Sequence, residues 1–236
     1  MGYFLADLNL VLDQAFRLEG EEAAHLLQSR RIRADEELEI QDPTGQRFLC
    51  RVLARERRSL ELLPQRPLTP PAEPEFKLYL HQAMVKEKAL DFILQKATEL
   101  GAAGIYLFES EHSQRLPEGR DREKKEERWQ KILWEACKQS GRQRPPELGL
   151  EETSPLVSSF SEPCFVLDPY HEGPLLKDLA LEGAARMLLG PEGGFAQEEL
   201  AGFQGQYLKL GPRVLRADTA ALAGLSLFGA YFGDLH

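Results

Sequence analysis

The chain has few cysteines and no apolar run long enough to cross a membrane. Cys50, Cys137 and Cys164 are isolated from one another and form no C-x-x-C pair, which is typical of reduced core thiols in a cytosolic protein. The longest apolar stretches end well short of the ~20 residues of a spanning helix. The segment from Met1 to Asp7 lacks the basic start and long apolar run of a signal peptide. We therefore expect a cytoplasmic protein with no membrane association.

Two further absences narrow the choice of ligand. The five histidines are scattered without ligand spacing, so we expect no metal site. The chain has no G-x-G-x-x-G after its first α/β-type strand and no G-x-x-x-x-G-K-S/T motif, which disfavours dinucleotide and triphosphate ligands. The net charge of −9 argues against indiscriminate binding to nucleic acid.

Basic residues nevertheless cluster locally. Arg30, Arg31 and Arg33 form one such cluster. In an acidic protein, clusters of this kind would contact a structured RNA at chosen phosphates. The alternative for any one cluster is a solvated surface paired with nearby glutamates.

A proline-rich segment divides the chain. Residues 64–74 contain five prolines, which are incompatible with a helix or a central strand, and we expect a semi-rigid linker there. The predicted domains are residues 1–67 and residues 75–236. With 42% hydrophobic residues in a chain of 236, each part can bury a core.

The part before the linker has the pattern of short strands. Polar and apolar residues alternate in three segments, and a helix is expected at 20–28. A small β-barrel suits this pattern. The predicted strands are 37–40, 47–53 and 59–62.

The part after the linker alternates strands and helices, which predicts a parallel sheet covered by helices. Helices are expected at 86–100 and 121–140, with Gly101 and Gly141 just beyond their ends. A last helix, from about Thr219 with Asp218 or Thr219 as its N-cap, is apolar nearly all round. The predicted strands are 76–80, 104–108, 164–167, 186–189 and 207–210.

Two glycine-proline loops follow the last two predicted strands. The first reads L-L-G-P-E-G-G-F over residues 188–195, and the second reads L-G-P-R-V-L-R-A-D-T-A over residues 210–220. Glycine lets a backbone pass close to a ligand, and proline fixes the path of a loop. One such loop is commonly only a turn. Two of them at adjacent strand ends predict a pocket at the carboxyl edge of the sheet.

The paired loops resemble the signature of the SPOUT superfamily, and more narrowly that of the RsmE-type 16S ribosomal RNA uridine-N3 methyltransferases. Ala217 and Asp218 stand where that family usually has Thr and Glu, so a carboxylate is kept. Residues 86–101 and 128–142 resemble the family's middle runs, and residues 25–35 resemble its N-terminal region more loosely. The resemblance therefore covers nearly the whole chain.

This resemblance implies a fold, a cofactor and a reaction. The expected fold is a trefoil-knotted α/β domain with helices on both faces of a parallel sheet, preceded by a PUA-like RNA-binding β-barrel. The implied cofactor is S-adenosylmethionine, and the implied substrate is 16S ribosomal RNA, free or in the small subunit. Family members are homodimers, and contact through the knot region would explain the apolar last helix. The alternatives are a SPOUT-type ribose 2′-O-methyltransferase and a non-catalytic RNA-binding assembly factor.

The resemblance also carries roles to single residues. Uridine N3 carries a proton, so its methylation needs a base, a cation that stabilises the anion, or both. Arg216 is the first candidate for the cation, and Glu192 is the candidate for a base or an orienting group. The RNA would contact Arg30, Arg31, Arg33 and Lys86. The residues expected to bind the cofactor are Leu167, Leu189, Gly190, Pro191, Glu192, Gly193, Gly194, Leu210, Gly211 and Leu215.

Overall fold

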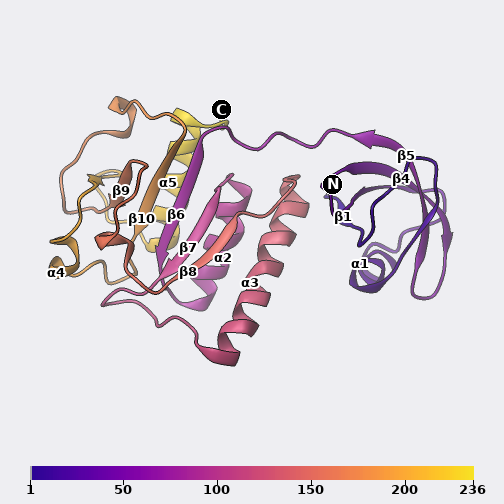
Figure 1. The fold of residues 1–236 in the computed structure, drawn as a ribbon, viewed down its shortest axis with the longest axis horizontal. Helices are drawn as coiled ribbons and strands as arrows, with labels where there is room; N and C mark the ends of the chain where they lie inside the picture. Colours follow the sequence, from indigo (N-terminus) through magenta and orange to yellow (C-terminus); the bar gives the residue numbers. More distant parts are fainter. Residues whose placement is uncertain (1) are drawn as a thin grey trace. The chain divides into compact units, whose positions relative to one another are not determined.

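The computed structural model describes residues 2–236, and the chain folds into two compact units. One unit holds the residues up to Ala72 together with Cys137–Arg144, and the other holds Glu73–Ala136 and Pro145–His236. Figure 1 shows strands dominating the first unit and a sheet covered by helices forming the second. No helix among the described residues is both long enough and apolar enough to cross a membrane.

The first unit is built on a curled, mixed five-stranded sheet in the order β1-β3-β4-β5-β2. Strand β1 pairs with β3 in parallel, and the other pairs are antiparallel. Alternation of side chains sends Leu38, Ile40, Cys50 and Val52 into one core. The elements of this unit are β1 (Phe4–Leu5), β2 (Phe16–Leu18), α1 (Gly20–His25), the π-helical η1 (Leu26–Arg30), β3 (Glu37–Gln41), β4 (Arg47–Arg55) and β5 (Leu60–Leu68).

The prediction that residues 64–68 belong to a linker was wrong. Strand β5 continues to Leu68, and Pro64 and Pro67 lie opposite Cys50 and Phe48 of β4. Strand β2 pairs with β5 only as far as Leu62, and beyond that point the other edge of β5 pairs with no strand of residues 2–236, although Pro64 O accepts from Asp13 N at 2.9 Å. Proline is tolerated there because its missing N–H removes no hydrogen bond of a strand ladder.

The second unit is a six-stranded sheet in the order β11-β9-β10-β6-β7-β8, and every pair is parallel. The predicted strand–helix alternation is therefore confirmed as an α/β fold. Its strands are β6 (Lys77–Ala83), β7 (Gly104–Phe108), β8 (Glu147–Glu151), β9 (Cys164–Leu167), β10 (Ala184–Leu189) and β11 (Gln206–Leu208). Its helices are α2 (Glu87–Glu99), α3 (Gly119–Ser140), α4 (Gln197–Leu200) and α5 (Ala217–Phe232), with short 3-10 turns η2 (Pro155–Val157) and η3 (Leu176–Asp178).

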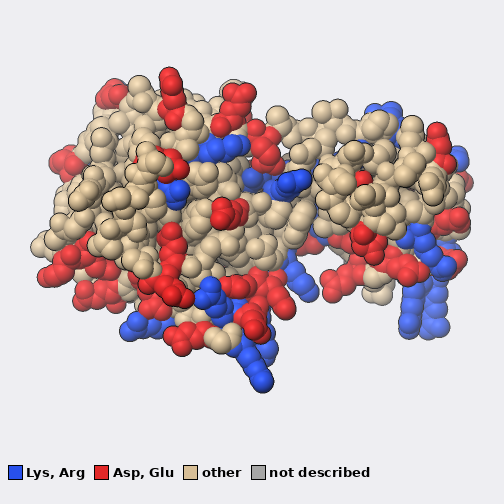
Figure 2. Space-filling model, viewed as in Figure 1, with Lys and Arg blue, Asp and Glu red and all other residues tan. Residues whose placement is uncertain are grey.

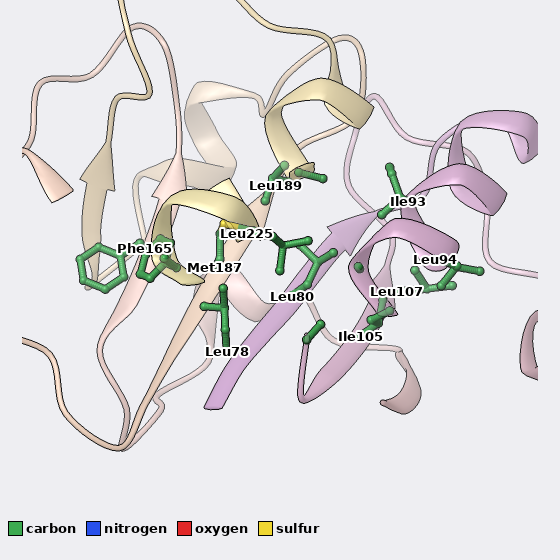
Figure 3. Packing of buried hydrophobic residues seen from close by; sticks show 14 of the residues in the cluster. Leu78, Leu80, Ile93, Leu94, Ile105, Leu107, Phe165, Met187, Leu189 and Leu225 are labelled. Atoms are coloured by element: carbon green, nitrogen blue, oxygen red, sulfur yellow. The ribbon is translucent and has the colours of Figure 1, made fainter. Parts of the chain in front are cut away.

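The sheet carries helices on both faces. The register aligns Leu80 with Ile105 and Met187, and these side chains pack against α2, α3 and α5 in the main core. Figure 3 shows Leu225 of α5 with Ile93 and Leu94 of α2 in one cluster with the strand side chains. On the opposite face, Val166 and Leu188 pack with Leu200 of α4. Alternation along each parallel strand thus supplies both cores.

Several boundaries differ from the sequence prediction. Strand β11 ends at Leu208 instead of Leu210, because its partner β9 ends at Leu167, which lies opposite Leu208. Helix α5 begins at Ala217, and its N-cap is Arg216, which is extended and whose carbonyl accepts from Ala220 N at 2.7 Å. The expected cap at Asp218 or Thr219 was wrong, since Asp218 lies in the first turn and its Oδ1 accepts from Thr219 N. Strands β1, β2 and β8 and helix α4 were not predicted.

The cysteines are all free. Cys50 and Cys137 are buried, and burial raises the pKa of the Cys50 and Cys164 thiols to about 12. These thiols are therefore protonated and unreactive at neutral pH, as the composition predicts.

Candidate active site

A cavity of about 510 Å³ lies at the carboxyl ends of three neighbouring strands. Leu167, Leu189 and Leu208 are the last residues of β9, β10 and β11, and all three line it. The strand order places β9 between β10 and β11, so the two glycine-proline loops flank one strand instead of following adjacent ones. The predicted pocket at this edge of the sheet is present, and its size is that of a small-molecule site.

The first loop, residues 190–194, is closely packed at Gly190 and Gly193. A Cβ on Gly190 would lie 3.3 Å from the Phe195 ring, and a Cβ on Gly193 would lie 3.0 Å from Cβ of His112. Gly194 has a φ of 71°, which favours glycine, and its N–H donates to Pro191 O at 3.0 Å. The loop is therefore a tight turn whose backbone forms the pocket wall.

A second segment supports this turn from outside. His112 Nδ1 lies 3.3 Å from Gly194 O, and since that carbonyl can only accept, Nδ1 carries the proton in this contact. Glu111 N donates to the Glu199 carboxylate at 3.0 Å, and the Phe108 and Phe195 rings stack with centroids 6.2 Å apart. These contacts fix the loop from the side facing away from β9.

The second loop runs from Leu210 into α5. Its exposed residues Arg213, Val214 and Arg216 line the cavity. Within residues 2–236, neither Arg213 nor Arg216 has an ion pair or a side-chain hydrogen bond. The two guanidinium groups therefore leave positive charge at the opening, available for an anionic ligand.

The structure brings together every residue that the sequence predicted for cofactor binding and for catalysis. Glu192 and Arg216, the two predicted catalytic residues, are exposed on opposite loops of the same cavity. All ten residues predicted to bind the cofactor line it: Leu167, Leu189, Gly190, Pro191, Glu192, Gly193, Gly194, Leu210, Gly211 and Leu215.

Sequence reasoning missed the loop that follows β9. Asp168, Pro169 and Tyr170 also line the cavity, as do Phe195, Leu208, Arg213 and Val214. Asp168 is 9% exposed, and its Oδ1 accepts from Tyr170 N at 2.6 Å and from His171 N at 3.0 Å. The position of Asp168 directly after a buried strand that ends beside the glycine loops is the signal that could have found it.

The carboxylate of Asp168 shapes the local electrostatics. His171 stacks on Tyr207 with ring centroids 4.3 Å apart, and its Nδ1 lies 3.2 Å from Asp168 Oδ1. Burial, followed by the negative charge of Asp168, raises the pKa of the Tyr207 phenol. The cavity thus has a buried acid, Asp168, among its leucines and glycines, while the charged groups of Glu192, Arg213 and Arg216 are exposed.

The predicted RNA-binding arginines belong to the other unit. Arg30 ends η1 with its guanidinium 5.5 Å from the centre of the Phe4 ring, and Arg31 and Arg33 follow it as exposed residues. Lys86 is the exposed N-cap of α2 and is not among the residues lining the cavity. Figure 2 shows that most of the face drawn is neither acidic nor basic, with acidic and basic side chains in separate groups.

Comparison with known proteins gives both units a family. Residues 72–229 match the model of an RNA methyltransferase domain, and residues 18–65 match that of an RNA methyltransferase PUA domain. Ribosomal RNA small subunit methyltransferase E of Aquifex aeolicus is 31% identical over 84% of this chain and 87% of its own. The Mycobacterium bovis protein of the same name is also 31% identical, over 90% of this chain and 85% of its own.

Solved structures agree with this comparison. A methyltransferase from Legionella pneumophila in complex with bound S-adenosylmethionine has a TM-score of 0.89 at 28% identity, with both chains covered completely. Ribosomal RNA small subunit methyltransferase E from Neisseria gonorrhoeae, bound to S-adenosylmethionine, has a TM-score of 0.87 at 29% identity over 99% of each chain.

The fold and the cavity thus define an RNA methyltransferase that joins a PUA domain to a catalytic α/β domain. The chain belongs to the RsmE-type family of ribosomal RNA small subunit methyltransferases, as its motifs predicted.

Proposed function

We propose that this enzyme transfers a methyl group from S-adenosylmethionine to N3 of a uridine in 16S ribosomal RNA, in the cytoplasm. The observation that carries the proposal is the shared cavity in which both motif loops meet, with Arg216 and Glu192 at its opening. Relatives of this family that were solved with S-adenosylmethionine bound support the choice of cofactor.

The cavity fits this cofactor in size and in chemistry. Its volume of about 510 Å³ suits a molecule of nucleoside size, and leucine side chains line its walls. Gly190 and Gly193 let the loop pack against Phe195 and His112, where a Cβ would collide, so that the loop presents its backbone to the cavity. The leucines and the glycine backbone of the ten predicted residues would hold the adenosine part.

The chemistry asked of the protein is removal of a proton and stabilisation of charge. Bound S-adenosylmethionine supplies an already activated methyl group on a sulfonium. The uridine N3–H must lose its proton before nitrogen can attack, and the resulting anion places charge on O2 and O4. Arg216 has no competing ion pair within the described residues and would stabilise that anion, while Glu192 would accept the proton or orient the base.

We infer a division of labour between residues 1–67 and residues 75–236. The first part would dock the RNA through Arg30, Arg31 and Arg33, and the second would hold the cofactor and carry out the transfer, with Lys86 contacting RNA. Arg31 and Arg33 are exposed and have no ion pair within residues 2–236, so they are available to phosphates. The match of residues 18–65 to a PUA domain of RNA methyltransferases supports this assignment.

We also propose a trefoil knot and a homodimer for the catalytic domain. The segment between β9 and β10 passes close over β11, since a Cβ on Gly173 would lie 1.8 Å from Tyr207 O. Helix α5 then packs against η3 of that segment and against β10 and β6, as a chain threaded through it would. The outer side of α5 bears exposed Ala230 and Tyr231, which would lie in the contact with a second copy.

Nucleoside mass spectrometry of ribosomal RNA tests the function directly. A strain lacking the gene should lose N3-methyluridine from its small-subunit RNA, and the gene on a plasmid should restore it. Loss of a 2′-O-methylated nucleoside instead would identify a ribose methyltransferase. An unchanged nucleoside profile, with assembly defects alone, would identify a non-catalytic factor.

The role of Arg216 has its own test. Arg216→Ala should slow single-turnover methylation by about a hundredfold, because the uridine anion loses its stabilising cation. Arg216→Lys keeps the charge and should recover part of the rate. Binding of cofactor and of RNA, measured separately, should change little in either variant. A normal rate for Arg216→Ala would remove this residue from the catalytic site.

A further inference from the structure

The rim of the cavity carries an exposed aromatic ring that the proposed cofactor site does not use. Tyr170 lines the opening and is 78% exposed, and its ring contacts no other ring within residues 2–236. On the other loop of the same opening stand Arg213, which is exposed, and Val214, which is 65% exposed. We call Tyr170, Arg213 and Val214 the pocket rim.

The backbone that bears Tyr170 is held in place although its side chain is free. Asp168 Oδ1 accepts from the N–H groups of Tyr170 and His171, which closes a turn directly after β9. Asp168 is itself almost completely buried. The fold therefore presents the tyrosine ring at the opening on a fixed backbone, so only the side-chain rotamer remains to be ordered when the ring binds.

Arg213 provides the charge that accompanies such a ring in RNA recognition. No hydrogen bond or ion pair joins Arg213 to another described residue, although the chain has more acidic residues than basic ones. Proteins that bind unpaired RNA stack bases on aromatic side chains and contact the backbone with arginine. Ring, apolar surface and free cation coincide here around one opening.

The reaction requires unpaired RNA at this place. A base that is methylated within a cavity must leave its stack and enter, so the nucleotides on either side of it lie across the opening. They have then lost a stacking partner of their own. An exposed aromatic ring at the rim replaces that partner, and a guanidinium beside the opening can reach the phosphate.

We propose that the pocket rim binds the nucleotides next to the target base: Tyr170 stacks on a neighbouring base, and Arg213 contacts a backbone phosphate. This inference rests on the proposed function, because it takes RNA as the substrate of this cavity. It assigns to the catalytic domain a contact with RNA separate from the arginines of the first unit.

The test compares RNA binding with cofactor binding in full-length variants. RNA affinity is measured with purified small ribosomal subunits and with their extracted RNA, and cofactor affinity is measured by calorimetry with S-adenosylmethionine. Tyr170→Ala should weaken RNA binding about tenfold, within the range found when a stacking aromatic is removed. Tyr170→Phe keeps the ring and should bind RNA normally. Cofactor affinity should stay within about twofold in both, that is within ~0.4 kcal/mol, because the proposed cofactor site does not use this ring.

Arg213 is tested through salt dependence. Arg213→Ala should weaken RNA binding and lower the slope of log affinity against log salt concentration by about one, as for one lost phosphate contact. Arg213→Lys keeps the charge and should keep the slope. Normal RNA affinity in both alanine variants would overturn the proposal. Weakened cofactor binding with normal RNA binding in Tyr170→Ala would show instead that this ring covers the cofactor.

Measurements on the wild-type protein distinguish failure of the proposed function from failure of the rim proposal. If the wild type neither binds nor methylates small-subunit RNA, the proposed function fails and the rim proposal fails with it. If the wild type methylates that RNA and the rim variants behave like it, only the rim proposal fails.

Discussion

Gly193→Val is expected to weaken cofactor binding through a collision outside the pocket. The Cβ at this position points toward His112, 3.0 Å from its Cβ and 3.5 Å from its Cγ, and not into the cavity. Gly193 does not have a left-handed φ, so the effect of a side chain is steric and not conformational. Glu111 N donates to the Glu199 carboxylate, which anchors the backbone next to His112 outside the loop, so we expect the glycine loop to be the part that moves.

The size of the effect follows from the cost of overpacking. Inserting methyl groups into a well-packed core costs ~1–3 kcal/mol, and because Gly193 and His112 are exposed we expect the lower part of that range, ~1–2 kcal/mol. Relief of that strain by a shift of the loop into the cavity would come at the expense of cofactor binding. At ~1.4 kcal/mol for each factor of ten, affinity should fall between about fivefold and about thirtyfold.

Calorimetry with S-adenosylmethionine measures this loss, and thermal unfolding shows whether the variant is folded. His112→Gly removes the atoms that valine would meet, so the double variant Gly193→Val/His112→Gly should recover much of the affinity. Gly202→Ala is the control for a glycine change away from the cavity, since its φ is not left-handed and its Cβ would meet only Val157 Cγ1, at 3.4 Å. Unchanged affinity in folded Gly193→Val, or no recovery in the double variant, would refute this reasoning.

Two further predictions concern assembly and RNA docking. Ala230→Asp should convert the proposed dimer into a monomer without loss of fold, because residue 230 is exposed on α5; sedimentation velocity measures this, and a wild type that is monomeric at micromolar concentration would contradict it. Replacing Arg31 and Arg33 together by alanine should weaken RNA binding and lower its salt slope by up to about two, with cofactor affinity unchanged. An unaltered salt slope in that double variant would count against docking by these arginines.

The choice of Ala230 depends on the tertiary structure. Leu225 and Phe228 are two of the apolar residues of this helix, α5. Both are buried within the core of their own unit, at 1% and 0% exposure. A charge there should unfold the domain whatever its oligomeric state, so it cannot test assembly.

Local patterns in the sequence determined the element types and the place of the site. Strand β7 at 104–108 and strand β9 at 164–167 begin and end where the pattern predicts, and α2 differs from its prediction by one residue at each end. Gly101 and Gly141 adopt the left-handed conformation just beyond α2 and α3. These features depend on periodicity and backbone conformation within a few residues, which a sequence records directly.

Only the tertiary structure decided which segments meet. The order β11-β9-β10 places the loop after β9 between the two glycine-proline loops, and this brings Asp168 and Tyr170 to the cavity. Nothing local distinguishes a tyrosine at the rim of a cavity from one on any exposed turn. The edge of β5 that admits Pro64 and Pro67 likewise has no strand partner among residues 2–236 because β2 stops pairing at Leu62. Such facts follow from contacts between distant segments, and the chain encodes them only through the packing of the whole fold.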